Sequence, residues 1–317
     1  MNVRNRGVAL ITALLVVAIA ALAATALLSS TSLAIHRTAA LRDSEQAWWV
    51  ARGVDAWILG IFATDAQESR HDSLDEVWAQ PVDYLPVEQG FVRGRVEDLN
   101  GRFNLNNLNP KLPQVETYRA QFRNLLRNLP EVDEPLGLDD AIQDWIDDNQ
   151  NPGSMNGAED GEYLNLAPPY RAADRPFTVV SELRAIRGMT PEVYDKLAPL
   201  VAALPAKAGA PASPVNVNTA PLEVLRALSA ATDESKLGEF EQRRREEPVK
   251  DAAGIQKLVE SGVWGADVKK ELLTWKSSFF QIQGEIFVGS SRVALYSLIH
   301  RPDSGPAVVL AHSAEAE

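Results

Sequence analysis

The first thirty residues constrain this chain more than any other stretch. Residues 8–28 contain no charged side chain, and only Thr12 and Thr25 among them are polar. At the rise of an α-helix these residues span about 32 Å, which matches the hydrocarbon core of a bilayer. Arg4 and Arg6 precede the run without an acidic residue. The positive-inside rule therefore predicts a single pass with a cytoplasmic N-terminus and the bulk of the chain on the other side of the membrane.

The same run allows a second interpretation, a cleaved secretory signal. In that case the Ala-Leu-Ala segment at 21–23 is the cleavage site, and the mature chain begins at Ala24. Two features favour a retained anchor instead. The apolar run continues to Leu28 without a proline or a glycine, and a helical pattern follows it.

Helical periodicity continues after residue 28. Apolar residues recur at steps of three or four, and polar residues mostly occupy the positions between them. We therefore predict one helix of some fifty residues, with a membrane part at 8–28 and an amphipathic periplasmic part at 29–65. The apolar positions are Leu33, Ala34, Leu41, Trp48, Val54, Ile58 and Ile61.

This N-terminus resembles the type IV prepilin family, which includes the pseudopilins of type II secretion. The resemblance rests on a short basic leader that ends in Gly7, on the apolar run that follows at once, and on the long helix. It implies that residues 1–7 are a leader, which a prepilin peptidase removes by cleaving between Gly7 and Val8. It also implies methylation of the new N-terminus at Val8 and retention of the apolar helix.

Most members of that family carry a glutamate at the fifth mature position, where this sequence has Thr12. The resemblance implies that this glutamate pairs with the terminal amine of a neighbouring subunit during assembly. An unpaired carboxylate at membrane depth is costly, so a subunit with no neighbour on that side is better without it. Thr12 thus indicates a tip subunit, as in the large minor pseudopilins, the GspK family. The alternative is that Thr12 is a tolerated polar residue in an ordinary anchor.

Two β-hairpins are predicted near the ends of the soluble part. The first, in residues 90–108, turns at Asn100-Gly101, a strong hairpin dipeptide, and the second turns at 289–291. Their alternating apolar residues are Val92, Val96, Phe103, Leu105, Phe280, Ile282, Ile286, Val288, Val293, Leu295 and Ile299.

The middle of the chain, residues 106–276, predicts helices separated by prolines, with an Ala/Pro/Gly-rich linker near 204–214 that divides it into two parts. The pattern predicts an α+β fold. A long N-terminal helix packs on a small antiparallel sheet, which a large helical insertion interrupts. Residues 66–105 form a pilin-like region with the first hairpin, and 277–317 return to the sheet. The predicted helical stretches are 115–129, 138–148, 179–188, 190–204 and 219–229.

An acidic segment lies inside the insertion. Residues 139–170 hold eight carboxylates and no Lys or Arg. Asp147, Asn149 and Asn151 alternate as at the start of an EF-hand loop, but the match then fails, because the sixth position is a proline and the twelfth is Ala158. A site for a hard cation and a solvated acidic loop both remain open. The carboxylates are Asp139, Asp140, Asp144, Asp147, Asp148, Glu159, Asp160 and Glu162.

The segment from Asp144 to Tyr170 resembles the calcium-binding loop of the GspK family. The resemblance implies calcium as the bound ion. It implies the ligands Asp147, Asn149, Glu159 and Asp160, with an asparagine at 149 where members more often have an aspartate.

Composition argues against several other functions. The formal net charge is −12, which disfavours nucleic acid, and the absence of cysteine excludes disulfides and thiolate chemistry. The four histidines are scattered, and no nucleophile elbow, P-loop or dinucleotide fingerprint appears. We therefore predict no enzymatic activity. The alternatives are a signal-peptide-bearing or membrane-tethered periplasmic hydrolase, and a helix-hairpin-helix binding protein, because the segment that begins with residues 214–228 is similar to such modules.

The resemblance as a whole implies a minor pseudopilin of type II secretion. Such a subunit would initiate assembly of the periplasmic pseudopilus from the inner membrane and support the export of folded proteins across the outer membrane. The implied partners are the other minor pseudopilins (GspI, GspJ and GspH), the prepilin peptidase, the inner-membrane assembly platform, and the secretin or exoproteins.

Overall fold

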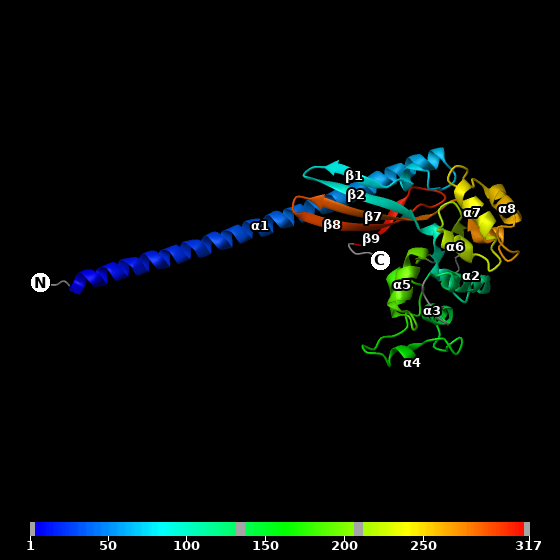
Figure 1. Ribbon diagram of the computed structural model, residues 1–317, viewed down its shortest axis with the longest axis horizontal. Coiled ribbons are helices and arrows are strands. Elements are labelled where there is room, and N and C mark those ends of the chain that lie inside the picture. Colours follow the sequence, from blue (N-terminus) through cyan, green and yellow to red (C-terminus); the bar gives the residue numbers. More distant parts are fainter. Residues whose placement is uncertain (1–3, 131–136, 206–211, 314–317) are drawn as a thin grey trace.

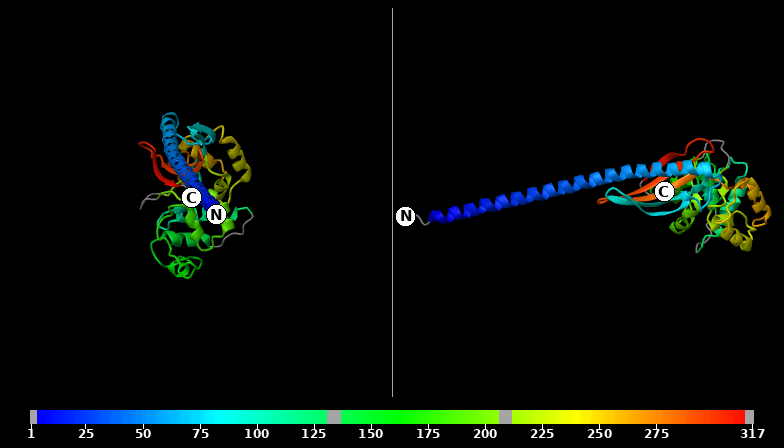
Figure 2. Two further views of the ribbon diagram at one scale, coloured as in Figure 1. Left: turned by 90° about the vertical axis from the view of Figure 1, so that its left-hand side faces the viewer. Right: turned by 90° about the horizontal axis from the view of Figure 1, so that it is seen from above.

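The computed structural model describes residues 4–130, 137–205 and 212–313. Its longest element is α1 (Arg4–Glu68), one continuous helix of 65 residues, as the apolar and amphipathic runs predict. The first half of α1 projects alone from the rest of the molecule (Figure 1, Figure 2). Its apolar side chains are exposed, from Val8 at 62% to Leu28 at 77%. Within the described residues, α1 is the helix long and apolar enough to cross a membrane.

An antiparallel five-stranded sheet packs against the second half of α1 (Figure 1). The strand order is β1-β2-β7-β8-β9, so β2 and β7 are neighbours although some 180 residues separate them in the chain. Val92 lies opposite Ile286, and Val96 lies opposite Ile282. The predicted sheet with a large insertion is confirmed. The strands are β1 (Val82–Val87), β2 (Gly90–Asp98), β7 (Phe279–Val288), β8 (Ser291–His300) and β9 (Val308–Ser313).

The predicted hairpin near residue 290 is confirmed. Strands β7 and β8 pair from Phe279 opposite His300 to Val288 opposite Ser291. Its turn is tied to α1, because the Asp43 carboxylate accepts hydrogen bonds from Ser290 N at 2.8 Å and Ser290 Oγ at 2.9 Å. Gly289 has a φ of +53°, and a Cβ there would lie 2.4 Å from an Asp43 oxygen, so both conformation and space require glycine.

The predicted hairpin across Asn100-Gly101 is wrong. Strand β2 ends at Asp98, whose carboxylate accepts a hydrogen bond from Asn100 N at 2.8 Å and starts a short 3₁₀ turn. The chain then leaves the sheet, and β3 (Phe103–Asn104) pairs in parallel with β4 (Val201–Ala202). Glycine is required at position 101 because the chain there passes close to Thr219, not because of a hairpin turn. A Cβ at Gly101 would lie 2.8 Å from Thr219 Oγ1.

The face of α1 that packs on the sheet differs from the predicted stripe. Ala47, Ala51, Ile58 and Phe62 are buried there, at 0–6% exposure. Of the predicted apolar positions, Ile58 is buried and Val54 and Ile61 are half-buried, whereas Leu33, Leu41 and Trp48 are exposed. Small alanines allow the helix to approach the strands closely, which a count of large apolar side chains does not detect.

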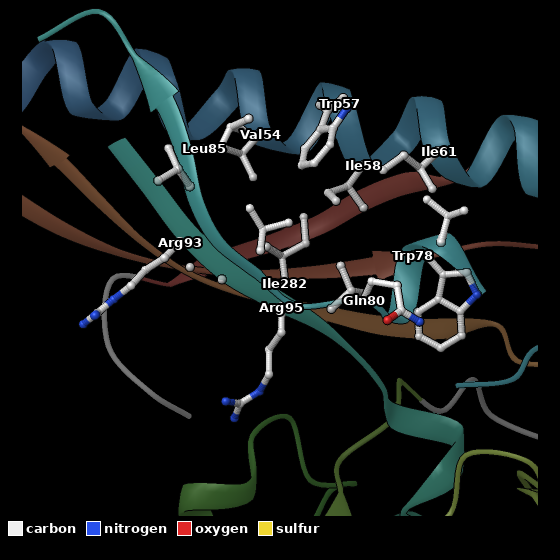
Figure 3. A pocket seen from close by; sticks show the side chains of 16 residues that line it. Val54, Trp57, Ile58, Ile61, Trp78, Gln80, Leu85, Arg93, Arg95 and Ile282 are labelled. Atoms are coloured by element: carbon white, nitrogen blue, oxygen red, sulfur yellow. The ribbon is translucent and has the colours of Figure 1, made fainter. Parts of the chain in front are cut away.

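A small apolar crevice remains between α1 and the sheet (Figure 3). Its volume is about 40 Å³, and Val54, Trp57, Ile61 and Leu85 line it. The edge strand β1 shifts register against β2 between Val82 and Leu85, and its Leu85 and Val87 still pack against the core of the sheet.

Residues 99–278, here called the helical part, contain seven α-helices among the residues described and a core of their own. Three predicted helical stretches, 179–188, 190–204 and 219–229, are shorter than expected, and the last is helical only over Leu222–Ala227. Residues 180–185 form a 3₁₀ helix, and the helix that begins at Pro191 ends at Leu197, after which the chain extends into β4. The α-helices are α2 (Val115–Arg127), α3 (Leu138–Ile146), α4 (Asp160–Tyr163), α5 (Pro191–Leu197), α6 (Leu222–Ala227), α7 (Glu234–Arg243) and α8 (Ala252–Glu260).

The helical part leaves and rejoins the sheet at one end. It begins after β2 and ends before β7, and a second parallel pair, β5 (Val215–Asn216) with β6 (Leu273–Thr274), lies close to that junction. Figure 1 places this end of the sheet away from the projecting half of α1. Residues 206–211 of the predicted linker at 204–214 lie outside the described residues.

Candidate functional site

The predicted processing and assembly residues lie on the projecting half of α1. Gly7 and Val8 belong to the helix that begins at Arg4. The Thr12 hydroxyl donates within its own helix, with the Val8 oxygen at 3.1 Å and the Ala9 oxygen at 3.0 Å. Such a bond satisfies a threonine in an apolar medium without a partner subunit, unlike a carboxylate at the same position.

In the acidic segment, four of the eight carboxylates have cationic partners from outside it. Arg119 and Arg123 of α2 pair with Asp139, and Arg119 also pairs with Asp140. The remaining pairs are Lys111 Nζ with Asp148 at 2.7 Å and Arg171 Nη1 with Asp160 at 2.9 Å. Half of the carboxylates in the segment are therefore compensated by cations from outside it.

Three carboxylates without such partners converge. One oxygen each of Asp144, Asp147 and Glu159 lie within 4.8 Å of one another. Asp144 is on α3, Asp147 ends that helix in an extended conformation, and Glu159 immediately precedes α4. The side chain of Asp144 is 1% exposed and that of Glu159 is 4% exposed. Asp144 Oδ2 and both oxygens of Glu159 have no hydrogen-bond donor.

This clustering affects the protonation of the group. Burial raises the pKa of Glu159 to about 7, and the negative charges of Asp144 and Asp147 add to the shift. Burial also raises the pKa of Asp144, against the lowering effect of a hydrogen bond from Gly153 N at 3.0 Å. Ionised together, the three carboxylates repel one another, so they need either protons or a cation.

The backbone leaves space beside these oxygens. A Cβ at Gly157 would lie 2.1 Å from Asp144 Oδ2, and a Cβ at Gly153 would lie 3.2 Å from Asp144 Oδ1. Glycine at these two positions keeps the approach to Asp144 open. Carboxylate oxygens in a Gly-rich loop are the donor set that a hard cation such as calcium prefers, so these residues fit the implied ion.

Three aromatic side chains pack together beside the acidic loop. Trp145 and Tyr163 meet edge to face at 5.3 Å between ring centroids, and Tyr163 stacks on Tyr170 at 5.3 Å. Because Trp145 follows Asp144 and Tyr163 follows Glu159 by four residues, this packing brings both ends of the loop together.

Two of the four predicted metal ligands, Asp147 and Glu159, belong to the convergent group. Asp160 instead accepts hydrogen bonds from Arg171 and from Ala172 N, and the exposed Asn149 side chain bonds to Asp147 Oδ1 at 2.7 Å. Asp144 was not among the predicted ligands. Its spacing of three residues from Asp147 on a helix, which puts both on one face, was the available signal.

Comparison with known proteins identifies the relatives of this chain. A family model described as "Type II secretion system (T2SS), protein K" matches residues 101–206. The type II secretion system protein K of Pseudomonas aeruginosa is 36% identical over 315 residues, which cover 97% of this chain and 92% of that protein. The protein of the same name from Pectobacterium carotovorum is 32% identical over 312 residues, covering 95% and 94%.

A solved structure has the same fold. In the crystal structure of the GspK-GspI-GspJ complex from the type 2 secretion system of enterotoxigenic Escherichia coli, one chain matches with a TM-score of 0.69 and 25% sequence identity. The match covers 89% of this chain and 100% of that chain. The predicted α+β fold with a long N-terminal helix is confirmed by this likeness.

We predict that Glu159→Gln stabilises the metal-free protein at pH 8. A raised pKa means that the folded state holds its proton more tightly than the unfolded state, so Glu159 costs stability as pH rises from about 4.5 to about 7. Removing the charge should raise the melting temperature in the presence of a chelator by about 2–4 °C. Glu162→Gln, in the same loop but exposed, is the matched control and should leave it unchanged. A lower melting temperature for Glu159→Gln would contradict this account.

Proposed function

The chain belongs to the type II secretion system protein K family, and we propose that it is the first subunit of a periplasmic pseudopilus, at its tip. It is a minor pseudopilin of this secretion system, as its relatives over nearly the whole chain indicate. The shape of the molecule carries the proposal of a tip position. The second half of α1 packs on the sheet, and its first half projects beyond one end of that sheet. The helical part lies at the other end, away from the projecting half (Figure 1).

The projecting half of α1 fits a single-pass membrane anchor. We propose that its N-terminus is cytoplasmic and that the sheet and helical part are periplasmic, because Arg4 and Arg6 precede the apolar run. We also propose cleavage by prepilin peptidase between Gly7 and Val8, with methylation of Val8. The internal hydrogen bonds of Thr12 support a first subunit, since this residue needs no amine from a subunit ahead of it.

The matched crystal structure is a complex of GspK with GspI and GspJ. We propose that this chain assembles with the corresponding two minor pseudopilins. GspH, the inner-membrane assembly platform, and the secretin or exoproteins are further proposed contacts of the same assembly.

We propose that the acidic loop binds calcium. Asp144, Asp147 and Glu159 would hold the ion, and Asn149 and Asp160 stay predicted ligands. A bound cation would neutralise the three carboxylates and give partners to oxygens that otherwise have none. In doing so it would hold the end of α3 against the start of α4.

A catalytic role is not part of this proposal. A serine, a histidine and an aspartate do meet where β8, β9 and α1 pack together. However, Ser297 Oγ at 3.1 Å and Asp55 Oδ2 at 3.6 Å both approach the same ring nitrogen, His312 Nδ1. A catalytic triad requires the serine and the carboxylate on opposite nitrogens, and Ser297 is fully buried.

Co-purification tests the proposed assembly. The full chain, expressed with its cognate GspI and GspJ and extracted in detergent, should elute with both proteins in one complex. The control is an unrelated protein with a single membrane anchor and a periplasmic domain. It should not elute with GspI and GspJ if their binding requires more than a membrane anchor. Recovery of the chain free of both pseudopilins would contradict the proposal.

Mass spectrometry of the membrane-derived chain tests the processing. We expect an N-terminal peptide that begins at Val8 and carries one methyl group, because cleavage before the apolar run retains the anchor. Gly7→Leu should leave the leader in place, whereas Asn5→Leu should still be processed. A mature chain that begins at Ala24 would establish an ordinary secretory signal.

Calcium titration tests the ion site. Calcium at about a hundred times its dissociation constant should stabilise the folded chain by about 2.7 kcal/mol, seen as a rise in melting temperature. Replacing Asp147 and Glu159 together by alanine should abolish the rise. Asp148→Ala is the matched control, because Asp148 lies next to Asp147 but is exposed and paired with Lys111. A calcium response that survives the double substitution would disprove the assignment.

A further inference from the structure

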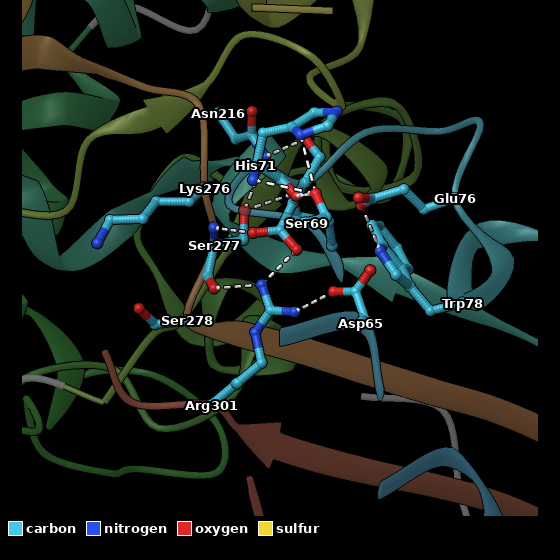
Figure 4. Close-up of polar contacts among 12 residues, drawn as sticks. Asp65, Ser69, His71, Glu76, Trp78, Asn216, Lys276, Ser277, Ser278 and Arg301 are labelled. Carbon is cyan, nitrogen blue, oxygen red and sulfur yellow. Dashed lines mark hydrogen bonds and ion pairs between the residues drawn. The ribbon is translucent and has the colours of Figure 1, made fainter. Parts of the chain in front are cut away.

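A second buried acidic group lies where the helical part joins the sheet (Figure 4). It comprises Asp65, Asp72, Asp98 and Arg301, here called the junction cluster. Asp65 is near the end of α1, Asp72 lies in the segment that follows it, Asp98 ends β2, and Arg301 follows β8. The cluster therefore brings the end of α1, the end of β2 and the chain after β8 to the place where the helical part begins and ends.

Asp98 is the most strongly bound member. Its Oδ2 accepts hydrogen bonds from Ser277 Oγ and Thr219 Oγ1, both at 2.6 Å, and from Asn216 Nδ2 at 3.0 Å. Its Oδ1 accepts from Asn100 N at 2.8 Å. Thr219, Asn216 and Ser277 belong to the helical part, so this carboxylate of the sheet is held by donors from the other side of the junction.

Arg301 connects the remaining two carboxylates. Its Nη1 lies 2.8 Å from Asp65 Oδ2, and its Nη2 pairs with Asp72 Oδ1. The guanidinium also lies over the rings of Phe62 and Phe280, at 5.3 and 4.9 Å from the ring centroids. These rings exclude water from the pairs. The second oxygen of Asp72 accepts a hydrogen bond from Ser277 N at 2.7 Å, which ties it to the helical part.

The cluster has more negative than positive charge. Three carboxylates share one guanidinium, and the nearby cations are occupied elsewhere, Lys276 by Asp303 and Arg102 by Glu97. His71 bonds through Nδ1 to Ser69 Oγ at 2.8 Å. Two further acidic side chains add to the imbalance. One oxygen of Glu76, in the segment before β1, lies within 4.8 Å of oxygens of Asp65 and Asp72, and Glu68 lies on α1.

Burial makes this imbalance sensitive to protons. It raises the pKa of Asp72 to about 7, with a contribution from the negative charge of Asp98, and it raises the pKa of Asp65 to about 6. In both groups the attraction of Arg301 opposes the shift but does not cancel it. The folded junction therefore binds protons more tightly than the open one, and its stability decreases as pH rises from about 4 to about 7.

We propose that the junction cluster is a proton-dependent clamp between the sheet and the helical part. When one of the three carboxylates holds a proton, the guanidinium compensates the remaining negative charge better, and less repulsion opposes the hydrogen bonds across the junction. When all three are ionised, their mutual repulsion loosens those bonds, and the helical part gains freedom to move relative to α1 and the sheet. The clamp would thus control the orientation of the helical part, independently of calcium and of the anchor.

Hydrogen exchange of the full chain in detergent tests the clamp. The backbone amide of Ser277 donates to Asp72 and should exchange only when the junction opens. After correction for the intrinsic effect of pH on exchange, we expect the population of this open state to rise at least tenfold from pH 5.5 to pH 8. Asp72→Asn should remove this rise. Asp303→Asn, an exposed change at a neighbouring ion pair, should keep it. An equal open population at both pH values in the unmodified chain would overturn the proposal, as would an unchanged rise in Asp72→Asn.

A second measurement covers the case in which Asp72→Asn does not fold. The chain has no cysteine, so spin labels can be placed at two positions only, through Glu88→Cys in the sheet and Glu239→Cys in the helical part. Pulsed electron resonance should give a broader distance distribution at pH 8 than at pH 5.5. In Asp65→Asn, which removes one of the three carboxylates, the broadening should decrease. A distribution that does not change with pH would refute the clamp.

Discussion

One unbroken helix organises the whole molecule. In the bilayer no water is available to the backbone, so the apolar half of α1 satisfies its amides and carbonyls only as a helix. The second half continues the same hydrogen-bond ladder and packs on the sheet through Ala47, Ala51, Ile58 and Phe62. Because no proline interrupts it, the membrane part and the folded part are rigidly continuous. The orientation of everything else follows from this contact.

The sheet in turn decides where the helical part can lie. The β7–β8 turn is fixed to α1 by Asp43, so this end of the sheet faces the projecting half of the helix. The opposite end holds Asp98 and Phe279, between which the chain leaves and returns. The helical part is thereby placed at the far end from the anchor. A position at the tip of a filament gives such a bulky head the space it needs.

Buried charge marks both places where this architecture has a choice of state. In the acidic loop, Asp144 and Glu159 have oxygens without donors, and a cation would satisfy them. At the junction cluster, the oxygens of Asp98 and Asp72 have hydrogen-bond donors, and only their negative charge exceeds the positive charge nearby. The first arrangement is the proposed calcium site, and the second is the proposed proton-dependent clamp. The difference lies in hydrogen bonding, since both groups combine clustered carboxylates with burial.

The sequence by itself determined the anchor, the long helix, the second hairpin and the presence of an acidic loop, because each depends on periodicity or composition over neighbouring residues. Tertiary structure alone decided the rest. It turned Asn100-Gly101 from a hairpin into an exit from the sheet, since Asp98 and the approach of Thr219 outweigh a local turn preference. It brought Asp144 close to Asp147 and Glu159 and paired Asp160 with Arg171, and neither contact follows from spacing along the chain alone. It also brought Asp65 and Asp72 to Arg301, which lies 236 and 229 residues further along the chain, and no local pattern encodes such a meeting.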